Sequence, residues 1–322
     1  MKITYPILFS FLLIIPSLSF GQIDHLKALQ RTKKVDSILR AHSKDILDFS
    51  KVKIKSKADG LEIPSYIFQP LEKGTLKSRP ALVWVYGGIH DYFGTNYFPF
   101  IKEAVAKGYI VIAPEYRGAS GYGADFYNAL DYGGYEVEDI ISAGEYLVQE
   151  YPSVDPERMG VIGWSHGGYI SLLATMRKQT LFSCVVASVP VSNLIFRLSY
   201  KGPEYQKTFI SQKRIGALPH EKRELYLQRS PLYQVDHLGI PLLALFATND
   251  DDVDFVEAEQ LVNALKVKKS HLAETVIYKD PEHGHYLNRQ VDLKTLTRKD
   301  DKVQTDAWNR TWRFLDWHLG RK

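Results

Sequence analysis

Hydrophobic residues along the chain form two kinds of stretch that alternate from Pro80 onward. Continuous apolar runs occupy 81–86, 109–113, 159–163, 185–189, 240–246 and 274–278. Stretches with helical spacing follow these runs at 98–107, 136–150, 167–177, 255–265 and 308–317. Continuous strands that alternate with helices are typical of a parallel sheet covered on both faces. The pattern therefore predicts the α/β class, with a mostly parallel central sheet and helices on both faces.

The residues before Pro80 follow a different pattern. Residues 24–48 carry apolar side chains at helical spacing and predict an amphipathic helix that lies on the main domain. Two strands are expected after it, at 51–57 and 61–68, because Asp59-Gly60 between them is a hairpin turn signal. The start of the chain therefore adds a helix and a hairpin to the sheet.

The domain organisation follows from these stretches. We expect an N-terminal helix over 22–50 and one domain over 51–322, since no linker or repeat divides it. A polar, aromatic segment at 192–229 interrupts the alternation and predicts a small lid-like insertion. The aromatic residues of the last helix, 308–317, are expected to pack into the core, as bulky side chains at helical spacing usually do.

The first residues have the order of a secretory signal peptide. Met1-Lys2 is a short basic start, 7–15 is mostly apolar, and Ser19-Phe20-Gly21 is a small-x-small cleavage site. Prolines and serines interrupt the apolar run, which falls short of the roughly 20 residues of a spanning helix. We expect 1–21 to be a signal peptide and the protein to be exported, periplasmic or extracellular, without stable membrane insertion. An uncleaved anchor is the alternative.

Composition and charge narrow the classes of partner. The 322 residues are 45% hydrophobic and 24% charged, which is ordinary for a globular protein. The formal net charge is +4, without a long block of Lys or Arg, so charge gives no reason to expect nucleic acid. Cys184 is the only cysteine, which excludes an intrachain disulfide, and its apolar neighbours predict a buried, inert thiol.

The pentapeptide Gly163-Trp164-Ser165-His166-Gly167 stands where an apolar run meets a helical stretch. Gly-x-Ser-x-Gly between a strand and a helix is the pattern of a nucleophile elbow. The glycines remove Cβ atoms that would clash in the tight turn, so that Ser165 can stand exposed. The amides that follow lie at a helix N-terminus, where negative charge is favoured. The pattern predicts Ser165 as a nucleophile beside an anion site.

A serine nucleophile needs a base, and the base needs an orienting acid. After an elbow serine the expected chain order is acid, then histidine. Asp250 and His283 follow in that order, each just past an apolar run. Asp251 and Asp252 are the rivals for the acid, and His285 is the rival for the base. A His-x-His pair without other obvious ligands gives no metal site, so we expect neither a metal nor a cofactor.

Six segments resemble a known family in order and spacing. They are "VYGG" at 85–88, "EYRGASGYGADFYNALDYGGYEVEDI" at 115–140, "GWSHGG" at 163–168, "SPL" at 230–232, "TNDDDV" at 248–253 and "PEHGH" at 281–285. Together they resemble the catalytic domain of the prolyl oligopeptidase family of serine peptidases, within the α/β-hydrolase fold. The resemblance covers roughly residues 50–320. It does not include the β-propeller of larger members, which the residues before 50 are too few to build.

The resemblance implies roles for individual residues. It makes Ser165 the nucleophile, Asp250 the triad acid and His283 the triad base. It also implies an oxyanion hole formed by the hydroxyl of Tyr86 and the amide of His166. The alternative role for Tyr86 is that of a core aromatic residue that covers the end of the sheet.

Two further segments border the predicted site. The family builds its substrate pocket in the region of the insertion, where we expect Leu194, Phe196 and Arg197 to contact the substrate. The glycines of "RGASGYG" at 117–123 do not have the spacing or position of a dinucleotide-binding loop, and they indicate a flexible loop near the site.

The sequence thus predicts an exported serine hydrolase that cleaves short peptides through an acyl-enzyme. A carboxylesterase that acts on small or sugar-linked esters would use the same residues. A catalytically inactive binding protein on the same scaffold is the alternative from another class, against which the complete set of triad residues argues.

Overall fold

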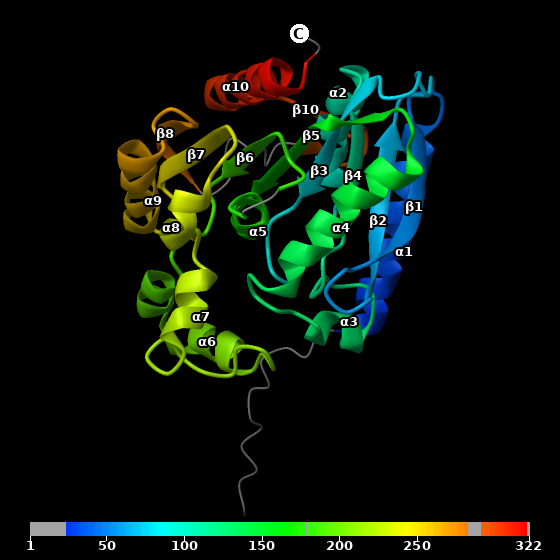
Figure 1. Ribbon diagram of the computed structural model, residues 1–322. Helices are drawn as coiled ribbons and strands as arrows, with labels where there is room; N and C mark the ends of the chain where they lie inside the picture. The colour runs from blue at the N-terminus through cyan, green and yellow to red at the C-terminus, as the bar shows by residue number, and fades with distance from the viewer. Residues whose placement is uncertain (1–23, 178–179, 283–290, 321–322) are drawn as a thin grey trace, which may run out of the picture.

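A mostly parallel sheet runs through the protein, as the alternating pattern predicts (Figure 1). The computed structural model describes residues 24–177, 180–282 and 291–320. The strand order in the sheet is β1-β2-β4-β3-β5-β6-β7-β8. The strands are β1 (Asp48–Lys55), β2 (Glu62–Gln69), β3 (Arg79–Val85), β4 (Ile110–Pro114), β5 (Val154–Trp164), β6 (Cys184–Ser188), β7 (Leu242–Asn249) and β8 (Ala273–Glu282). β2 is antiparallel to both its neighbours, and the strands from β4 to β8 are parallel.

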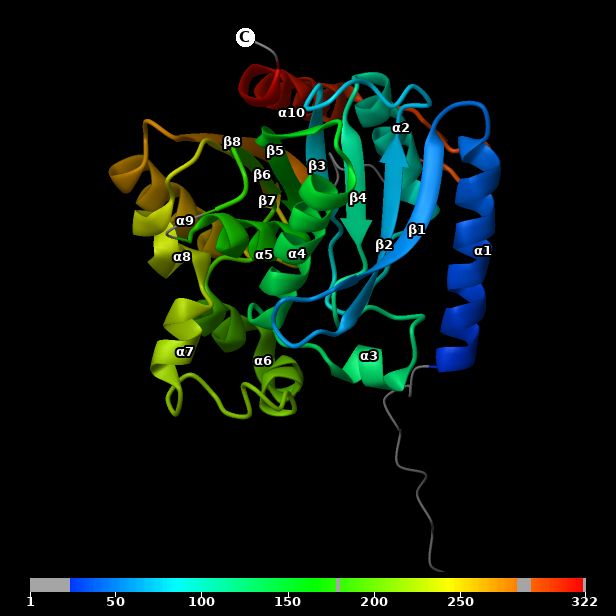
Figure 2. The ribbon, with the colours of Figure 1, turned by 45° about the vertical axis from the view of Figure 1, so that its right-hand side comes forward.

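Helices cover both faces of this sheet. The longer ones are α1 (His25–Ser43), α2 (Phe98–Ala106), α4 (Tyr135–Glu150), α5 (His166–Thr175), α6 (Leu194–Ile210), α9 (Phe255–Lys268) and α10 (Lys302–Leu319). The short elements are η1 (Thr95–Tyr97), α3 (Ala124–Asn128), α7 (Arg223–Gln228), α8 (Pro231–Gln234), η2 (Val235–His237) and the paired strands β9 (Val291–Asp292) and β10 (Thr297–Arg298). α4 and α5 pack on one face of the central strands, and α2 and α10 pack on the other (Figure 2). α3, α6 and α7 lie beyond the carboxyl edge of the parallel strands.

The predicted elements correspond to observed ones, with differences at their ends. The run at 159–163 lies within β5, which begins five residues earlier at Val154. Polar residues between Val154 and Arg158 hide this start, and the pairing of β5 with β3 is irregular there. The hydrophobic pattern therefore located the buried part of the strand but not its exposed beginning.

The N-terminal helix packs through only part of the apolar set predicted for it. The Asp24 carboxylate caps α1 by accepting hydrogen bonds from the amides of Leu26 and Lys27. Leu26 is 74% exposed and points away from the domain. The buried residues are instead spaced by four, three and four along the helix, at Ala28, Thr32, Val35 and Leu39. Small side chains on that face allow α1 to approach the loop after β4 closely.

The last helix, α10, docks on the sheet through most of its aromatic residues. Trp308 is buried and stacks parallel to Trp84 of β3, with ring centroids 6.1 Å apart. Its second aromatic neighbour is Phe100 of α2, 4.3 Å away. The expectation that all the aromatics pack is wrong for Trp317, which is 78% exposed. Trp317 lies on the outer face of α10, because a step of five positions from Trp312 turns the side chain by about 140° around the helix.

The loop 117–123 is packed rather than flexible, contrary to the expectation from its glycines. Gly118 and Gly121 have φ angles of 93° and 101°, which only glycine adopts readily. A Cβ atom on Gly121 would lie 2.1 Å from the Thr32 hydroxyl of α1. The glycines therefore permit close packing of the loop against α1 and a tight chain path.

Arg117, the first residue of this loop, is a fully buried cation. Its guanidinium donates to the buried carboxylate of Asp139 on α4, at 2.8 and 2.9 Å. It also donates to both carboxylate oxygens of Asp59 in the β1–β2 turn, at 3.0 Å each. Arg117 thus joins the hairpin, the loop after β4 and α4 in one charge-assisted network.

Cys184 on β6 is buried, as predicted, and burial raises the pKa of its thiol to about 12. Among the residues that the structure describes, no helix is both long and apolar enough to cross a membrane.

Candidate active site

The predicted nucleophile lies in a sharp turn between β5 and α5. Ser165 follows the last residue of β5 and has a φ of 52° and a ψ of −124°. A non-glycine residue with this backbone carries roughly 1–3 kcal/mol of strain. Two hydrogen bonds hold it there, from the Ser165 amide to the Ser188 carbonyl at 2.8 Å and from the Tyr169 amide to the Ser165 carbonyl at 3.0 Å. The turn has the geometry of a nucleophile elbow.

Glycines around Ser165 make this turn possible. A Cβ atom on Gly167 would lie 2.2 Å from the Tyr86 carbonyl oxygen, and one on Gly163 would lie 2.4 Å from the Gly167 carbonyl oxygen. Gly87, after β3, also lies against the turn, because a Cβ atom there would lie 3.2 Å from that of Ser165. The β3 loop, the end of β5 and the start of α5 therefore converge at Ser165.

The residue after the serine turns its side chain into the protein. The His166 ring is buried, and its Nε2 lies 3.0 Å from Oε2 of Glu136, which is itself fully buried. The same glutamate oxygen accepts a hydrogen bond from the Gly133 amide. The His166 amide is the first of α5, and the first amides of a helix have no partner within it. The side chain thus anchors the helix start, and the amide is the group available to an anion.

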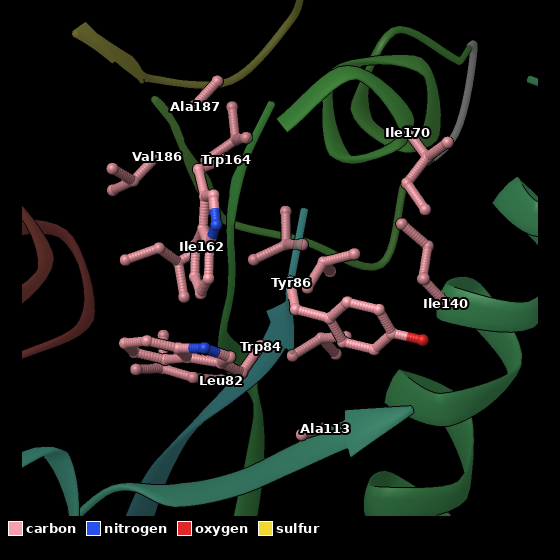
Figure 3. Packing of buried hydrophobic residues seen from close by; sticks show 14 of the residues in the cluster. Leu82, Trp84, Tyr86, Ala113, Ile140, Ile162, Trp164, Ile170, Val186 and Ala187 are labelled. Atoms are coloured by element: carbon pink, nitrogen blue, oxygen red, sulfur yellow. The ribbon is translucent and has the colours of Figure 1, made fainter. Parts of the chain in front are cut away.

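Tyr86 follows the last residue of β3, and its side chain is completely buried. Its ring stacks on that of Tyr116, with centroids 4.6 Å apart. Figure 3 shows its hydroxyl directed away from Trp84 and Trp164. The pKa of Tyr86 is raised well above its usual value, first by burial and then by the nearby Glu115 carboxylate. The hydroxyl therefore faces the Glu115 side of β3, and its oxyanion role stays a prediction.

The three consecutive aspartates after β7 occupy different environments. Asp250 is half-buried, and its Oδ1 accepts hydrogen bonds from the Asp252 and Val253 amides at 2.9 and 2.7 Å. Asp251 is exposed. The Asp252 carboxylate pairs with Arg197 and Lys201 of α6. Of the three, only Asp250 is both fixed by the turn and uninvolved in an ion pair with α6, which favours it as the predicted acid.

The predicted base, His283, and its rival His285 lie outside the described residues. β8 ends just before them at Glu282, which is in register with Asn249 at the end of β7. The strand that leads to the predicted base therefore ends beside the strand that leads to the predicted acid.

The residues expected to contact the substrate have different surroundings. Leu194 has no exposed surface, so it is part of the core at the start of α6 rather than of the wall of an open pocket. Phe196 is half-buried on α6. Arg197 is 3% exposed, and its guanidinium donates to Asp252, Tyr200 and Tyr205. These partners make Arg197 an anchor between α6 and the Asp250 loop, and of the three only Phe196 retains exposed surface for a ligand.

Two buried carboxylates near the site were not predicted from the sequence. Glu115 and Glu136 have no exposed surface. Both stand in segments whose resemblance to the family was noted, but a glutamate in a loop or at a helix start usually faces solvent. Only the packing shows that they are interior. A cluster of three or more His, Cys, Asp or Glu side chains suited to a metal ion does not occur among the described residues.

Comparisons with known proteins agree on a family. The sequence signature of the prolyl oligopeptidase family matches residues 96–321. The chain is 31% identical over 233 residues to "Uncharacterized peptidase YuxL" of Bacillus subtilis, and this alignment covers 72% of the chain and 34% of that protein. It is 29% identical over 285 residues to mouse "Prolyl endopeptidase FAP", in an alignment that covers 84% of the chain and 35% of that protein. The chain thus spans about a third of the length of these relatives.

Solved structures show the same fold. A puromycin-hydrolyzing peptidase of Mycobacterium tuberculosis aligns with a TM-score of 0.70 and 22% identity, over 86% of this chain and 40% of that one. An acylaminoacyl peptidase of Pyrococcus horikoshii aligns with a TM-score of 0.69 and 20% identity, over 88% and 43%. The architecture around Ser165 is therefore that of an α/β-hydrolase, and no β-propeller accompanies it within the described ranges.

Proposed function

Because the chain belongs to the prolyl oligopeptidase family and is therefore a serine hydrolase, we propose that it is a peptidase that cleaves short peptides through an acyl-enzyme on Ser165. The relatives with similar sequences are named as peptidases, which supports peptides as the substrate class. The chain spans only about a third of the length of these relatives, so the cleavage of short peptides is proposed for this chain and not carried over from them.

The reaction would take two steps. The Ser165 oxygen attacks the carbonyl carbon of the scissile bond while His283 accepts the serine proton, and Asp250 holds the imidazole in the required tautomer. The negative charge moves to the carbonyl oxygen, where the His166 amide and the Tyr86 hydroxyl donate hydrogen bonds. His283 then gives its proton to the leaving amine. Water, deprotonated by the same histidine, releases the acyl group and restores the serine.

The observation that carries this proposal is the backbone of Ser165. A positive φ in a serine between a buried strand and a buried helix is costly, and the Ser165 backbone is held there by its hydrogen bonds to Ser188 and Tyr169. Such strain at a serine is typical of functional sites, because no packing requirement needs a serine in that position. The helix start beside it supplies unpartnered amides for an anion.

Fluorophosphonate labelling tests the nucleophile directly. We expect the wild-type protein to be labelled and Ser165→Ala to lose both labelling and several orders of magnitude in kcat, since triad members act as a unit. Ser199→Ala, which changes an exposed serine on α6, is the matched control and should behave as wild type. Labelling that survives in Ser165→Ala would refute the assignment, and an unlabelled wild type would favour an inactive binding protein.

The same preparation separates the two enzyme classes. Aminoacyl-arylamides report peptidase activity, and p-nitrophenyl esters report the carboxylesterase that the same machinery would support. We expect turnover of the arylamides. Hydrolysis of esters alone would replace peptides by small esters as the substrate class and leave the Ser165 assignment intact.

We also propose that the protein is exported. The support is the sequence of residues 1–21, which lie outside the described part of the chain. Cell fractionation with N-terminal sequencing tests this, and a protein that keeps Met1 in the cytoplasm would contradict it.

A further inference from the structure

A buried glutamate and the predicted oxyanion tyrosine stand side by side at the carboxyl edge of the sheet. Tyr86 is the first residue after β3, and Glu115 is the first after β4. The two strands are parallel, and the last pair in their register is Val83 with Ile112, so the chain leaves both strands at the same edge of the sheet. Adjacent strands lie about 4.8 Å apart, which brings the two side chains within reach of each other.

Glu115 is held in place by groups other than Tyr86. Both of its carboxylate oxygens lie 3.2 Å from the Phe93 amide, and Oε1 accepts a hydrogen bond from the Tyr122 hydroxyl at 3.1 Å. The side chain has no exposed surface. Burial raises its pKa to about 7, despite the opposing effects of Tyr86, Lys51, Phe93 and Tyr122. This glutamate therefore changes between its neutral and ionised forms near neutral pH.

Lys51 of β1 is a cation that lowers the pKa of Glu115, and the Asp36 carboxylate of α1 partly neutralises it at 2.9 Å. Besides Tyr86, the other titratable side chains that interact with Glu115 are tyrosines: Tyr66 of β2, Tyr97 of η1, and Tyr116 and Tyr122 of the loop after β4. All four have pKa values raised above the ordinary one, so they stay neutral when Glu115 titrates.

The Tyr86 hydroxyl is buried and has no hydrogen bond of ordinary geometry within the described part of the chain. Its polar neighbour is the Glu115 side chain, which raises the pKa of Tyr86 and whose own pKa the tyrosine hydroxyl lowers. Buried polar groups without a partner are rare and call for an explanation. A phenol has one proton to donate. An ionised Glu115 only accepts, so it would compete with the substrate oxygen for that proton. A neutral Glu115 can donate to the phenol oxygen instead.

We propose that Glu115 is a positioning residue that acts through Tyr86: in its neutral form it donates a hydrogen bond to the Tyr86 oxygen and leaves the Tyr86 proton free for the substrate oxyanion. This inference rests on the proposed oxyanion role of Tyr86. A chain of two hydrogen bonds that point the same way also polarises each member, which strengthens the bond to the oxyanion. Ionisation of Glu115 reverses the first bond and draws the tyrosine proton away from the substrate.

The consequence is a loss of rate as pH rises through the pKa of Glu115. The histidine base must be neutral, so its titration makes the rate rise with pH, and the titration of Glu115 makes it fall again. The profile of kcat/KM against pH should be a bell with a descending limb centred at about pH 7.

The test is the pH profile of four proteins: wild type, Glu115→Gln, Tyr86→Phe and the double variant. A glutamine amide donates at every pH, so Glu115→Gln should lose the descending limb and exceed wild type on the alkaline side. Tyr86→Phe should lower kcat by about 10²–10³, as expected for a lost oxyanion donor. Adding Glu115→Gln to Tyr86→Phe should then change nothing further.

The outcomes separate this inference from its premise. A costly Tyr86→Phe together with an unchanged descending limb in Glu115→Gln would reject the role of Glu115 alone. A Tyr86→Phe variant within about threefold of wild type, too small for a lost donor, would reject the oxyanion role and this inference with it. Neither result affects the assignment of Ser165 as the nucleophile, which the labelling experiment tests separately.

A spectroscopic measurement keeps the inference testable if Glu115→Gln does not fold. In wild type labelled with ¹³Cζ-tyrosine, the Tyr86 resonance, identified by its absence from Tyr86→Phe, should titrate with a midpoint of about 6–8, near the pKa of the neighbouring carboxyl group. A resonance that stays constant over that range would overturn the proposal.

Discussion

Single residues show most clearly which features of the candidate site could be predicted from the sequence. Ser165 could be predicted because its neighbours are glycines in a recognisable pattern, and the structure places it at a positive φ in the expected turn. Glu115 and Glu136 could not be predicted. A charged residue is buried only when surrounding elements supply its partners, as the Phe93 amide and Tyr122 hydroxyl do for Glu115. Those partners come from distant parts of the chain, and no local pattern contains them.

The burial of Glu115 predicts how stability depends on pH. Its folded-state pKa of about 7 lies above the ordinary value of a glutamate, so between these values the folded protein holds a proton that the unfolded chain has lost. Stability from this group is present below the lower value and is lost as pH rises through 7. From about 1.4 kcal/mol per pKa unit, the loss is about 3 kcal/mol.

Urea unfolding of wild type and Glu115→Gln at pH 5 and pH 8 measures this loss. Because the unfolded glutamate is already largely ionised at pH 5, the difference in unfolding free energy between the two proteins should shift by about 2.5 kcal/mol in favour of the variant at the higher pH. Glu150→Gln, at an exposed position, is the control and should show no such shift. An equal difference at both pH values would contradict a titrating, buried Glu115.

At the scale of elements, the hydrophobic pattern located strands and helices well where they are buried. It failed where a side chain could face either way. Residues 308–317 of the last helix include five large apolar or aromatic side chains, and the pattern alone does not say which of them face away from the sheet. The structure divides them, because Trp308 is 3% exposed and Trp317 is 78% exposed.

The different exposure of Trp308 and Trp317 on α10 predicts that replacement by alanine destabilises the protein at the first position and not at the second. Trp308→Ala should lower the free energy of unfolding by about 3–5 kcal/mol, because it removes a ring packed between Trp84 and Phe100. Trp317→Ala should change it by no more than about 0.5 kcal/mol, as for other exposed positions. Denaturant midpoints of the two purified variants decide this. A similar loss in both would mean that Trp317 is covered in solution.

At the scale of the whole molecule, the candidate site is assembled from the ends of strands that are far apart in the sequence. Tyr86, Glu115, Ser165 and Asp250 follow β3, β4, β5 and β7 in turn. The sequence order and the α/β class were enough to predict that these ends meet at one edge of the sheet. They did not predict how the elements are held in position, because that depends on side chains such as Arg117 whose partners are set by the tertiary structure.

Arg117 is the clearest example of a side chain that holds several elements together through its hydrogen bonds. Arg117→Met keeps much of the side-chain volume but leaves the carboxylate of Asp139 buried without its cation. Burial already raises the pKa of Asp139 with Arg117 beside it, so the isolated charge is costly. Breaking a buried pair in this way should lower the free energy of unfolding by about 3–5 kcal/mol.

A second variant separates charge from packing in this network. Arg117→Met combined with Asp139→Asn removes the orphaned charge, while the amide oxygen of asparagine can still accept the hydrogen bond that the Arg117 backbone amide donates at 3.0 Å. The double variant should therefore be more stable than Arg117→Met alone, although it carries one substitution more. If the two losses instead add, Arg117 contributes mainly packing. The connection between the hairpin, α4 and the carboxyl edge of the sheet would then depend on packing rather than on charge.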